Sequence, residues 1–346
     1  MERQNIGNQL SRYNVNTQLA INMSTVDYIA DRQTDILSTS HFKIYTAISS
    51  GIYKTKIKKT IPFLLLFILN MIMVLFVSAC QMTTMSSGKE ITKTYTITRN
   101  GTLFTATNND IIIGTDNQPI QTVIDGIRND IIEKEACVIQ FETDGNILDI
   151  GIANVTFSGA DWGVIELTGE ITSTGNPTIA INDSISIKST ANIINTLASN
   201  RAISNNSTGT ITISGGVVSA ISGYGVYNFS SGEVIISGGN VSTTNGNAVY
   251  NNGAGKITIS GGEVSATGSG GTVYNYSTGT ITISGGEVHA TGTGGFGIFN
   301  LSTGLVNISG GTVSVTDPSG YAVYNSGTGT VTISSPPAII IGLTFP

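Results

Sequence analysis

The second half of the chain repeats one pattern of apolar and polar positions. Each copy contains alternating β-branched residues, a Ser-Gly-Gly step, a second apolar run, and a third run that usually closes on an aromatic residue and Asn. The Ser of the step recurs at Ser214, Ser237, Ser260, Ser284, Ser309 and, in a degenerate copy, Ser334. The closing Asn recurs at Asn205, Asn228, Asn251, Asn275, Asn300 and Asn325. Both markers advance in steps of 23 to 25 residues, so they belong to one repeating structural unit.

Three short runs in each unit have the character of β-strands. In one copy these runs are residues 211–214, 217–220 and 225–228, and they are separated by turn-forming residues. Alternating β-branched residues bounded by turn formers predict strands, and runs of this length are too short for helices. We therefore expect three short strands and three turns per unit.

A single unit cannot bury its apolar face, so successive units are expected to stack at a strand spacing of about 4.8 Å around one core. In these repeats the chain resembles the right-handed parallel β-helix of the pectin-lyase-like superfamily, in the form of repeat regions of bacterial surface proteins. The resemblance covers residues 137–335, and blurred copies before Asn205 bring the expected total to about eight coils. The expected fold class is all-β, and the resemblance is specific for a fold rather than for an activity.

The ends of such a stack expose core residues and strand edges, so a cover is expected. Residues 118–136 predict an amphipathic capping α-helix, because isoleucines and a valine recur at helical spacing after Pro119. Residues 81–117, before this helix, are interpreted as a linker and leading strands. Residues 336–346 form a tail that either folds over the last coil or begins something longer.

The charge of the chain is unevenly distributed. Only 11% of the residues are charged and 42 are Gly, which suits a repetitive β structure and argues against a charge-rich disordered chain. Residues 1–80 carry 8 Lys and Arg against 4 Asp and Glu, whereas the remainder carries 8 against 18. Because this acidic body has no basic patch in its sequence, nucleic acid is not expected as a partner.

Residues 57–80 have the organisation of a bacterial lipoprotein signal peptide. A basic stretch at residues 54–59 precedes an apolar run at residues 61–77, and Val77-Ser-Ala-Cys80 follows. The last four residues match a lipobox, in which Cys80 would be lipidated and would attach the protein to a membrane. Residues 1–56 are then either an unstructured extension before an uncleaved membrane anchor or sequence upstream of a mis-called start. In both cases the repeats are expected outside the cytoplasm, at the cell surface.

The repeats are poor in residues suited to catalysis. The charged residues of the segment from Asn205 to Pro346 are Glu233, Lys256, Glu263, Glu287 and Asp317. Lyases and hydrolases that act on polysaccharides need calcium-binding Asp clusters with a basic residue, or closely placed carboxylates. We therefore expect no catalytic residue and no cofactor, and a polysaccharide-degrading enzyme is the alternative hypothesis.

Several polar residues recur in register from coil to coil. Glu233 and Lys256 each precede their Ser by four residues, which predicts a surface ion pair. Glu263 and Glu287 both follow Gly-Gly one coil apart, so they are either two solvated side chains or a weak candidate for a Ca²⁺ site. His289 takes a position that is Ser in other copies, which predicts an outward side chain.

An aromatic residue also recurs at one position of the repeat. This predicted ladder consists of Tyr227, Tyr250, Tyr274, Phe299 and Tyr324. The alternation leaves open whether the rings close the core or face water, where they would be suited to stacking on the sugar rings of a glycan. The neighbouring Asn column is expected to bond from coil to coil and to stabilise the turns.

The sequence thus predicts a lipid-anchored cell-surface rod with a structural or adhesive role. Its expected partners are a membrane, through Cys80, and surface glycans or proteins of host or neighbouring cells. A glycan-binding or polysaccharide-degrading β-helix is the alternative.

Overall fold

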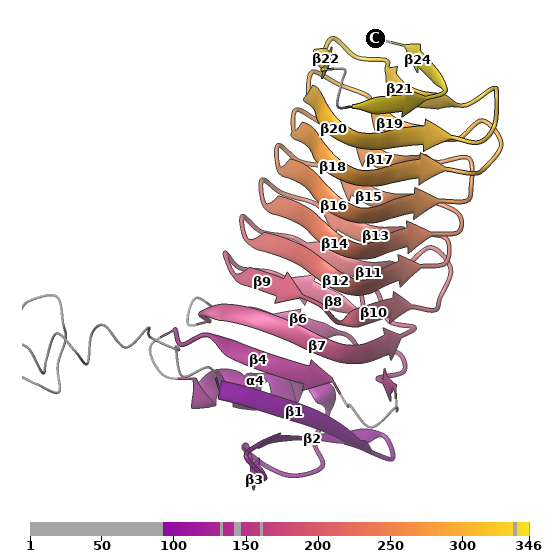
Figure 1. Cartoon of the computed structure of the whole chain (residues 1–346). Coiled ribbons are helices and arrows are strands. Elements are labelled where there is room, and N and C mark those ends of the chain that lie inside the picture. The colour runs from indigo at the N-terminus through magenta and orange to yellow at the C-terminus, as the bar shows by residue number, and fades with distance from the viewer. Residues whose placement is uncertain (1–92, 132–133, 142–146, 160–161, 335–337, 346) are drawn as a thin grey trace, which may run out of the picture. The chain divides into compact units, whose positions relative to one another are not determined.

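The computed structural model describes residues 93–131, 134–141, 147–159, 162–334 and 338–345. These residues belong to the unit Lys89–Pro346 and form a parallel β-solenoid of about eight turns between residues 137 and 345 (Figure 1). The structure confirms the expected mostly-β fold, the parallel stack of coils and the number of coils.

The strands of the described residues form two sheets. Sheet A has 15 strands and sheet B has nine, and each coil contributes to both. The solenoid strands of sheet A are β4 (Cys137–Phe141), β5 (Leu148–Asp149), β7 (Val164–Ser173), β9 (Ser186–Ser189), β10 (Asn192–Asn195), β12 (Thr210–Ala220), β14 (Glu233–Thr243), β16 (Lys256–Ala266), β18 (Thr280–Ala290), β20 (Leu305–Val315), β22 (Val331–Ile333) and β23 (Ile339–Ile341). The strands of sheet B are β6 (Val155–Phe157), β8 (Ile179–Ile181), β11 (Arg201–Asn205), β13 (Tyr224–Asn228), β15 (Asn247–Asn251), β17 (Gly271–Asn275), β19 (Phe296–Asn300), β21 (Tyr321–Asn325) and β24 (Leu343–Phe345).

The first two predicted strands of each later coil form one continuous strand of 11 residues, as in β12, β14, β16, β18 and β20. A shift of register interrupts the pairing of these strands at the Ser-Gly-Gly step. The second Gly of the step has a positive φ, for example +73° at Gly262. A Cβ added to Gly262 would also lie 2.6 Å from the carbonyl oxygen of Gly239 in the preceding coil. The step therefore needs glycine both for its backbone conformation and for the close approach of the coils.

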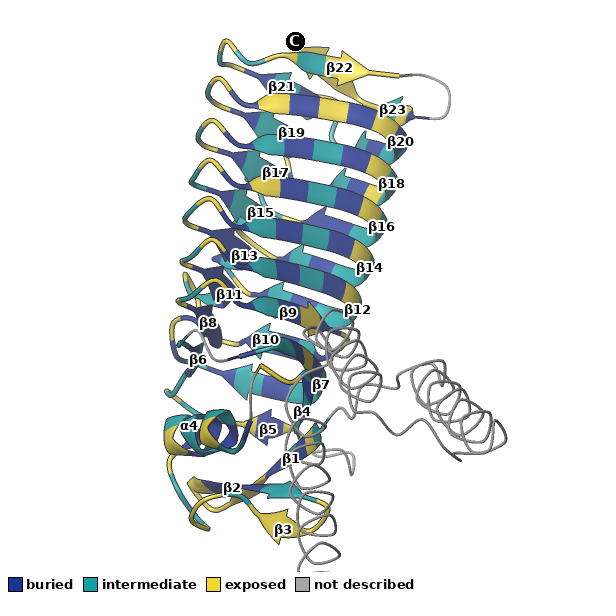
Figure 2. Cartoon of the chain, turned by 90° about the vertical axis from the view of Figure 1, so that its left-hand side faces the viewer, coloured by how far each residue is buried: buried dark blue, intermediate teal, exposed yellow. Residues whose placement is uncertain are grey.

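The core is a stack of aliphatic side chains that runs along the solenoid. In β16, for example, Ile257, Ile259 and Val264 are fully buried, while Thr258 between them is partly exposed. The same inward positions are aliphatic in the neighbouring coils, with which they pair in register. Figure 2 shows this alternation of buried and partly exposed residues along the strands, with exposed residues concentrated in the turns.

The N-terminal end of the stack is covered by short strands and a helix. β1 (Lys93–Asn100) pairs with β4, and β2 (Leu103–Asn108) and β3 (Ile111–Ile112) extend sheet A in antiparallel fashion. The predicted capping helix is α4 (Ile120–Asp130), which packs against β2 and β6. It is shorter than expected, because Ile131 is extended and buries its side chain instead of continuing the helix.

Helix α4 also provides hydrogen-bond partners for backbone groups at the free edge of sheet B. The backbone N–H of Thr156 in β6 donates to Gln121 Oε1 at 2.8 Å, and Gln121 Nε2 donates to the Thr156 carbonyl at 3.0 Å. Arg128 donates to the carbonyl of Ser158 at 3.2 Å. The helix therefore replaces a neighbouring strand for β6, which is the function expected of a cap.

The C-terminal residues continue the solenoid instead of ending it at residue 335. β22 and β23 both pair in parallel with β20, and β24 pairs in parallel with β21. Residues 338–345 lie over the last complete coil, as one interpretation of the tail expected.

Candidate functional site

The predicted aromatic ladder is a column of stacked rings on the outer side of sheet B. Successive ring centroids of Tyr227, Tyr250, Tyr274 and Phe299 are 5.4, 5.1 and 4.7 Å apart, with interplanar angles of 4°, 14° and 6°. Tyr324 continues the column at 5.0 Å from Phe299 with a tilt of 41°. Parallel β pairing sets this spacing, because it places each ring one strand away from the same position in the next coil.

The column lies outside the core, and the inward position of the same strands is occupied by valine or isoleucine. Val226, Val249, Val273 and Ile298 are fully buried, whereas the rings beyond Tyr227 are half-buried. The interpretation in which the aromatic residues close the core is therefore wrong. The interpretation in which the column faces water is correct only for the edges of its rings, since neighbouring rings cover the faces of Tyr250, Tyr274 and Phe299.

Both ends of the column are closed by side chains that the repeat pattern did not predict. The guanidinium carbon of Arg201 lies 4.0 Å from the centroid of the Tyr227 ring, in the geometry of a cation–π interaction. At the other end Phe345 of β24 stacks on Tyr324 at 5.1 Å. The Arg201 position could have been found by aligning β11 with β13, because Arg201 pairs with Tyr224.

Burial changes the acid–base behaviour of the column. It raises the pKa of Tyr250 well above the usual tyrosine range, and neighbouring tyrosines add to the effect. Burial also raises the pKa of Tyr274 and of Tyr227, although Arg201 opposes the shift at Tyr227. The hydroxyl groups of these three tyrosines therefore stay protonated at neutral pH.

The Asn column has the structural role that the sequence predicts. The side-chain amides of Asn228, Asn251, Asn275 and Asn300 each donate to the side-chain oxygen of the next Asn at 2.8 to 2.9 Å. Each also donates to the carbonyl of the Gly four residues later. These amides are buried, so they fasten the turns of successive coils together.

The two carboxylates of the predicted calcium site are in register, and a histidine lies close to both. Glu263 pairs with Glu287 in neighbouring strands. His289 Nε2 lies 3.7 Å from Glu263 Oε1, and His289 Nδ1 lies 3.8 Å from Glu287 Oε1. The described residues contain no group of three or more His, Cys, Asp or Glu side chains arranged to hold a metal ion. The sequence did predict the outward position of His289, but it did not predict that both carboxylates lie beside it.

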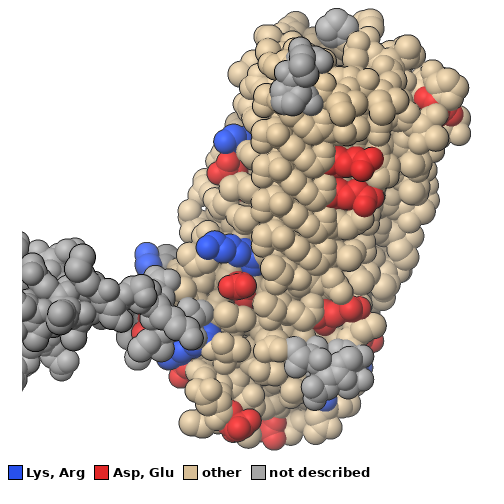
Figure 3. All heavy atoms as spheres, in the orientation of Figure 1, with Lys and Arg blue, Asp and Glu red and all other residues tan. Residues whose placement is uncertain are grey.

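The predicted ion pair between Glu233 and Lys256 is present. Lys256 Nζ lies 3.2 Å from Glu233 Oε1; the Lys256 side chain is exposed and the Glu233 side chain is partly exposed. On the face that Figure 3 presents, charged side chains form small, separate clusters, and most side chains carry no charge.

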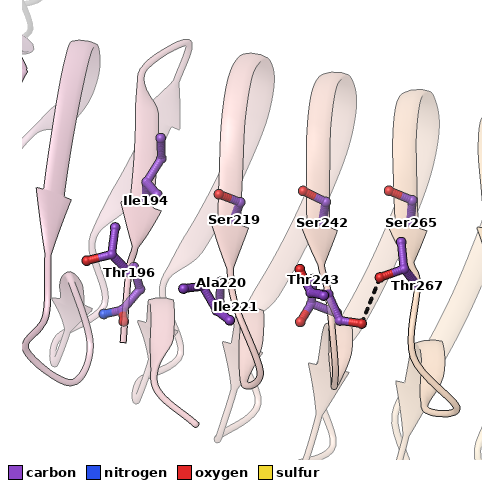
Figure 4. Close-up of a pocket in the computed structure, with 11 residues that line it drawn as sticks. Ile194, Thr196, Ser219, Ala220, Ile221, Ser242, Thr243, Ser265 and Thr267 are labelled. Carbon is purple, nitrogen blue, oxygen red and sulfur yellow. Dashed lines mark hydrogen bonds between the residues drawn. The ribbon is translucent and has the colours of Figure 1, made fainter. Parts of the chain in front are cut away.

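A shallow groove of about 310 Å³ runs across successive coils beside the end of the sheet A strands. Ser219, Ser242 and Ser265 lie side by side along it on consecutive strands, as Figure 4 shows. Thr267 at its rim donates to the carbonyl of Thr244 at 2.8 Å. The groove offers a row of hydroxyl groups, which can donate and accept hydrogen bonds.

The predicted lipid attachment residue, Cys80, lies outside the described residues, as do residues 1–56 and the apolar run at 61–77. Among the residues that the structure describes, no helix is both long and apolar enough to cross a membrane. Cys137 is free and buried, and burial raises the pKa of its thiol to about 12.

Comparison with known proteins gives no relative: no family model, no curated protein and no solved structure matches this chain.

Proposed function

We propose that this protein is a lipid-anchored rod at the bacterial cell surface, with a structural or adhesive role and without catalytic activity. The observation that carries the proposal is the uninterrupted stack of coils, in which one core and two side-chain columns fasten each turn to the next. Such a stack holds its outward side chains at a fixed spacing over a long surface, as repeat proteins with extended binding surfaces do.

The anchor and the location are supported by the sequence. Residues 54–80 combine a basic stretch, an apolar run and the lipobox that ends at Cys80. The resemblance of the repeats to the pectin-lyase-like β-helices of bacterial surface proteins agrees with such a location. A lipid on Cys80 would tether the solenoid to a membrane.

A non-catalytic role is supported by the partners of the carboxylates in the repeats. Glu233 pairs with Lys256, and Asp317 accepts hydrogen bonds from the backbone and the hydroxyl of Ser319. Glu263 and Glu287 flank one imidazole. In each case the contact suits a carboxylate that stabilises a surface or a turn.

The proposal is tested by expressing the full chain and its Cys80→Ala variant in a bacterial host. Metabolic labelling with a fatty acid should mark only the chain with Cys80, and added protease should cleave that chain on intact cells. An unlabelled Cys80 chain would contradict the anchor. A labelled, surface-exposed chain that gives cells no more adhesion than the variant does would contradict the adhesive role.

Glycan binding is a second candidate, and the hydroxyl-lined groove favours it. Ser219 and Ser242 are partly exposed and Ser265 is nearly buried, and their hydroxyl groups recur at the repeat of the coils, which suits hydrogen bonding to a polyhydroxylated chain. Binding on a glycan array that is lost in Ser242→Val, but kept in Thr282→Val elsewhere on sheet A, would support this candidate. Absence of binding to every glycan on the array would contradict it.

A further inference from the structure

The outer face of sheet B carries three parallel columns of side chains that together form an aromatic strip. The stacked column that runs from Tyr227 to Tyr324 lies in the middle. The aromatic and aliphatic residues of the two flanking columns are Tyr224, Phe296 and Tyr321 on one side and Phe229, Tyr276 and Leu301 on the other. Phe229 and Tyr276 are the most exposed of these, at 54% and 49%, and each stacks on a ring of the middle column.

The strip is almost free of charge although the unit around it is acidic. Arg201 is the only charged residue in the strands of sheet B from β11 to β24. The carboxylates of Glu233, Glu263 and Glu287 all lie on sheet A. Enrichment in Tyr and Phe together with depletion of charge is the composition of the centre of protein–protein interfaces, and contiguous exposed apolar patches mark such sites.

We propose that the aromatic strip is a self-association surface, on which a second copy of this chain packs with its solenoid axis antiparallel to the first. The inference goes beyond the proposed function and stands without the lipid anchor.

The repeat makes the strip complementary to itself. A two-fold axis along the strand direction, midway between β15 and β17, reverses the order of the coils in the second copy and leaves the two ends of each strand in place. β13 then faces the partner's β19, and β15 faces the partner's β17. The four levels from β13 to β19, each with one ring of the middle column, therefore meet one another as an isologous contact requires, and β21 faces the partner's β11.

The charges at the two ends of the strip favour this orientation. Arg201 begins β11, and Asp317 lies in the turn that precedes β21, so both stand at the same side of the sheet but five coils apart. Reversal of the coils places Arg201 of each copy beside Asp317 of the other. Hydrogen bonds from Ser319 hold the pKa of Asp317 below its usual range, so this carboxylate remains charged. A parallel pair would leave both charges without an opposite partner across the contact.

The stacking within the strip favours a protein surface over a glycan as its occupant. Sugar rings stack on the faces of aromatic rings, but the faces of Tyr250 and Tyr274 are covered by their neighbours. The middle column of the strip therefore presents ring edges and tyrosine hydroxyl groups. Edge-to-face contacts and hydroxyl hydrogen bonds are the contacts that such groups make across a protein interface.

The antiparallel orientation has a consequence that rests on the proposed function. The N-terminal ends of two antiparallel solenoids point in opposite directions. If Cys80 carries a lipid, one pair can therefore join two membranes. Adhesion would then be homophilic, between cells that carry the same protein.

The first test compares self-association of the full chain, purified in detergent, with that of two matched variants. Phe229→Glu/Tyr276→Glu should weaken the dimer at least tenfold in sedimentation equilibrium, with an unchanged circular dichroism spectrum. Leu305→Glu replaces a comparably exposed apolar residue, at 45%, on sheet A and should leave the dimer intact. A chain that stays monomeric, or a dimer that only Leu305→Glu disrupts, would overturn the proposal.

The second test concerns the orientation of the two copies. Asp317→Arg should weaken the dimer several-fold, and Arg201→Asp in the same chain should restore it. With Cys80→Ser and buried Cys137 as background, spin labels at Asn206→Cys and Ser326→Cys should be close together only when the two variants are mixed. Copies labelled at Asn206→Cys alone should show a separation of about 24 Å, five coil spacings. A short distance in that sample would show parallel packing and would overturn the antiparallel assignment.

The test of the lipid anchor and the test of self-association can fail independently of each other. A dimer in detergent with no lipid on Cys80 would support the strip and contradict the anchor, and a lipidated monomer would do the reverse.

Discussion

Each inward position of the repeat holds an aliphatic side chain that contacts its equivalents in the coils above and below. Val273 in β17 is fully buried and pairs with Val249 on one side and Ile298 on the other. Thr282 in β18 lies between two buried isoleucines but is itself partly exposed. The consequence of a substitution therefore depends on which side of the strand a residue occupies.

A charge placed at the inward position should destabilise the solenoid far more than one placed outside. Val273→Asp buries a carboxylate between aliphatic neighbours, which should cost about 3 kcal/mol or more. Thr282→Asp should change the stability by less than about 0.5 kcal/mol. Thermal unfolding followed by circular dichroism compares the two, and equal melting temperatures would show that the inner and outer sides are assigned wrongly.

The Asn column should be important for stability because its members are buried and bonded on both sides. Asn275→Ala removes the donor to the Gly279 carbonyl and breaks the bonds to Asn251 and Asn300. Unsatisfied buried groups typically cost 1 to 3 kcal/mol, so a loss of roughly 3 kcal/mol is expected in denaturant unfolding. Asn252→Ala, beside the column and partly exposed, is the control and should be nearly neutral. Equal losses for both variants would contradict a structural role of the column.

Alkaline pH should weaken the solenoid through its tyrosine column. The pKa of Tyr250 is raised in the folded state, mainly by burial, so its hydroxyl loses a proton more readily in the unfolded chain. The stability that this residue contributes is therefore fully present below the unfolded tyrosine pKa of about 10 and declines as the pH rises above it. Denaturant unfolding at a pH of about 8 and about 11 should show a smaller alkaline loss for Tyr250→Phe than for the native chain. An identical loss in both would contradict this contribution.

At the scale of the element, the bend in the long sheet A strands is the feature that defines a coil. The Ser-Gly-Gly step lets one strand of 11 residues change direction without leaving the sheet, and the register shifts of neighbouring strands coincide there. The bend depends on glycine for two separate reasons, the positive φ and the contact with the preceding coil. The two can be separated by substitution.

Gly262→Ala should be strongly destabilising, whereas Gly294→Ala should cost only the strain of the backbone. Both glycines have positive φ, +73° and +67°, but a Cβ at Gly294 would meet no atom within 4 Å. The backbone conformation alone typically costs 1 to 3 kcal/mol. Chemical denaturation should therefore give a clearly larger loss for Gly262→Ala, because its Cβ also pushes two coils apart. Similar losses would mean that the contact between coils contributes nothing.

At the scale of the whole molecule, each coil interacts with its two neighbours, and the two ends are built differently. The N-terminal end is covered by α4 and the antiparallel strands, whereas β22 to β24 keep about half of several large apolar side chains exposed. Stability in such stacks is approximately a sum over neighbouring pairs of coils. Damage near the C-terminal end of the described residues should therefore remain local.

Val323→Asp should destabilise the solenoid less than Val273→Asp, although Val323 is equally buried at 1%. In hydrogen exchange followed by mass spectrometry, Val323→Asp should increase exchange in β20 to β24 and leave β12 to β16 protected. Val273→Asp should increase exchange in coils on both sides of β17. Uniform loss of protection in both variants would show that the stack unfolds as one cooperative unit.

The sequence by itself determined the repeat, and the repeat determined the stack. Because pairing in parallel strands places equivalent residues of successive coils side by side, the period alone predicted the columns of Asn and aromatic residues and the pair of Glu233 with Lys256. Tertiary structure decided which way the aromatic column faces, since in β15 two consecutive residues, Ala248 and Val249, are both buried and break the alternation before Tyr250. It also decided the contacts of Arg201 and Phe345 with the column and the place of His289 between two carboxylates. These contacts join single residues from different coils, so the period of the repeat does not predict them.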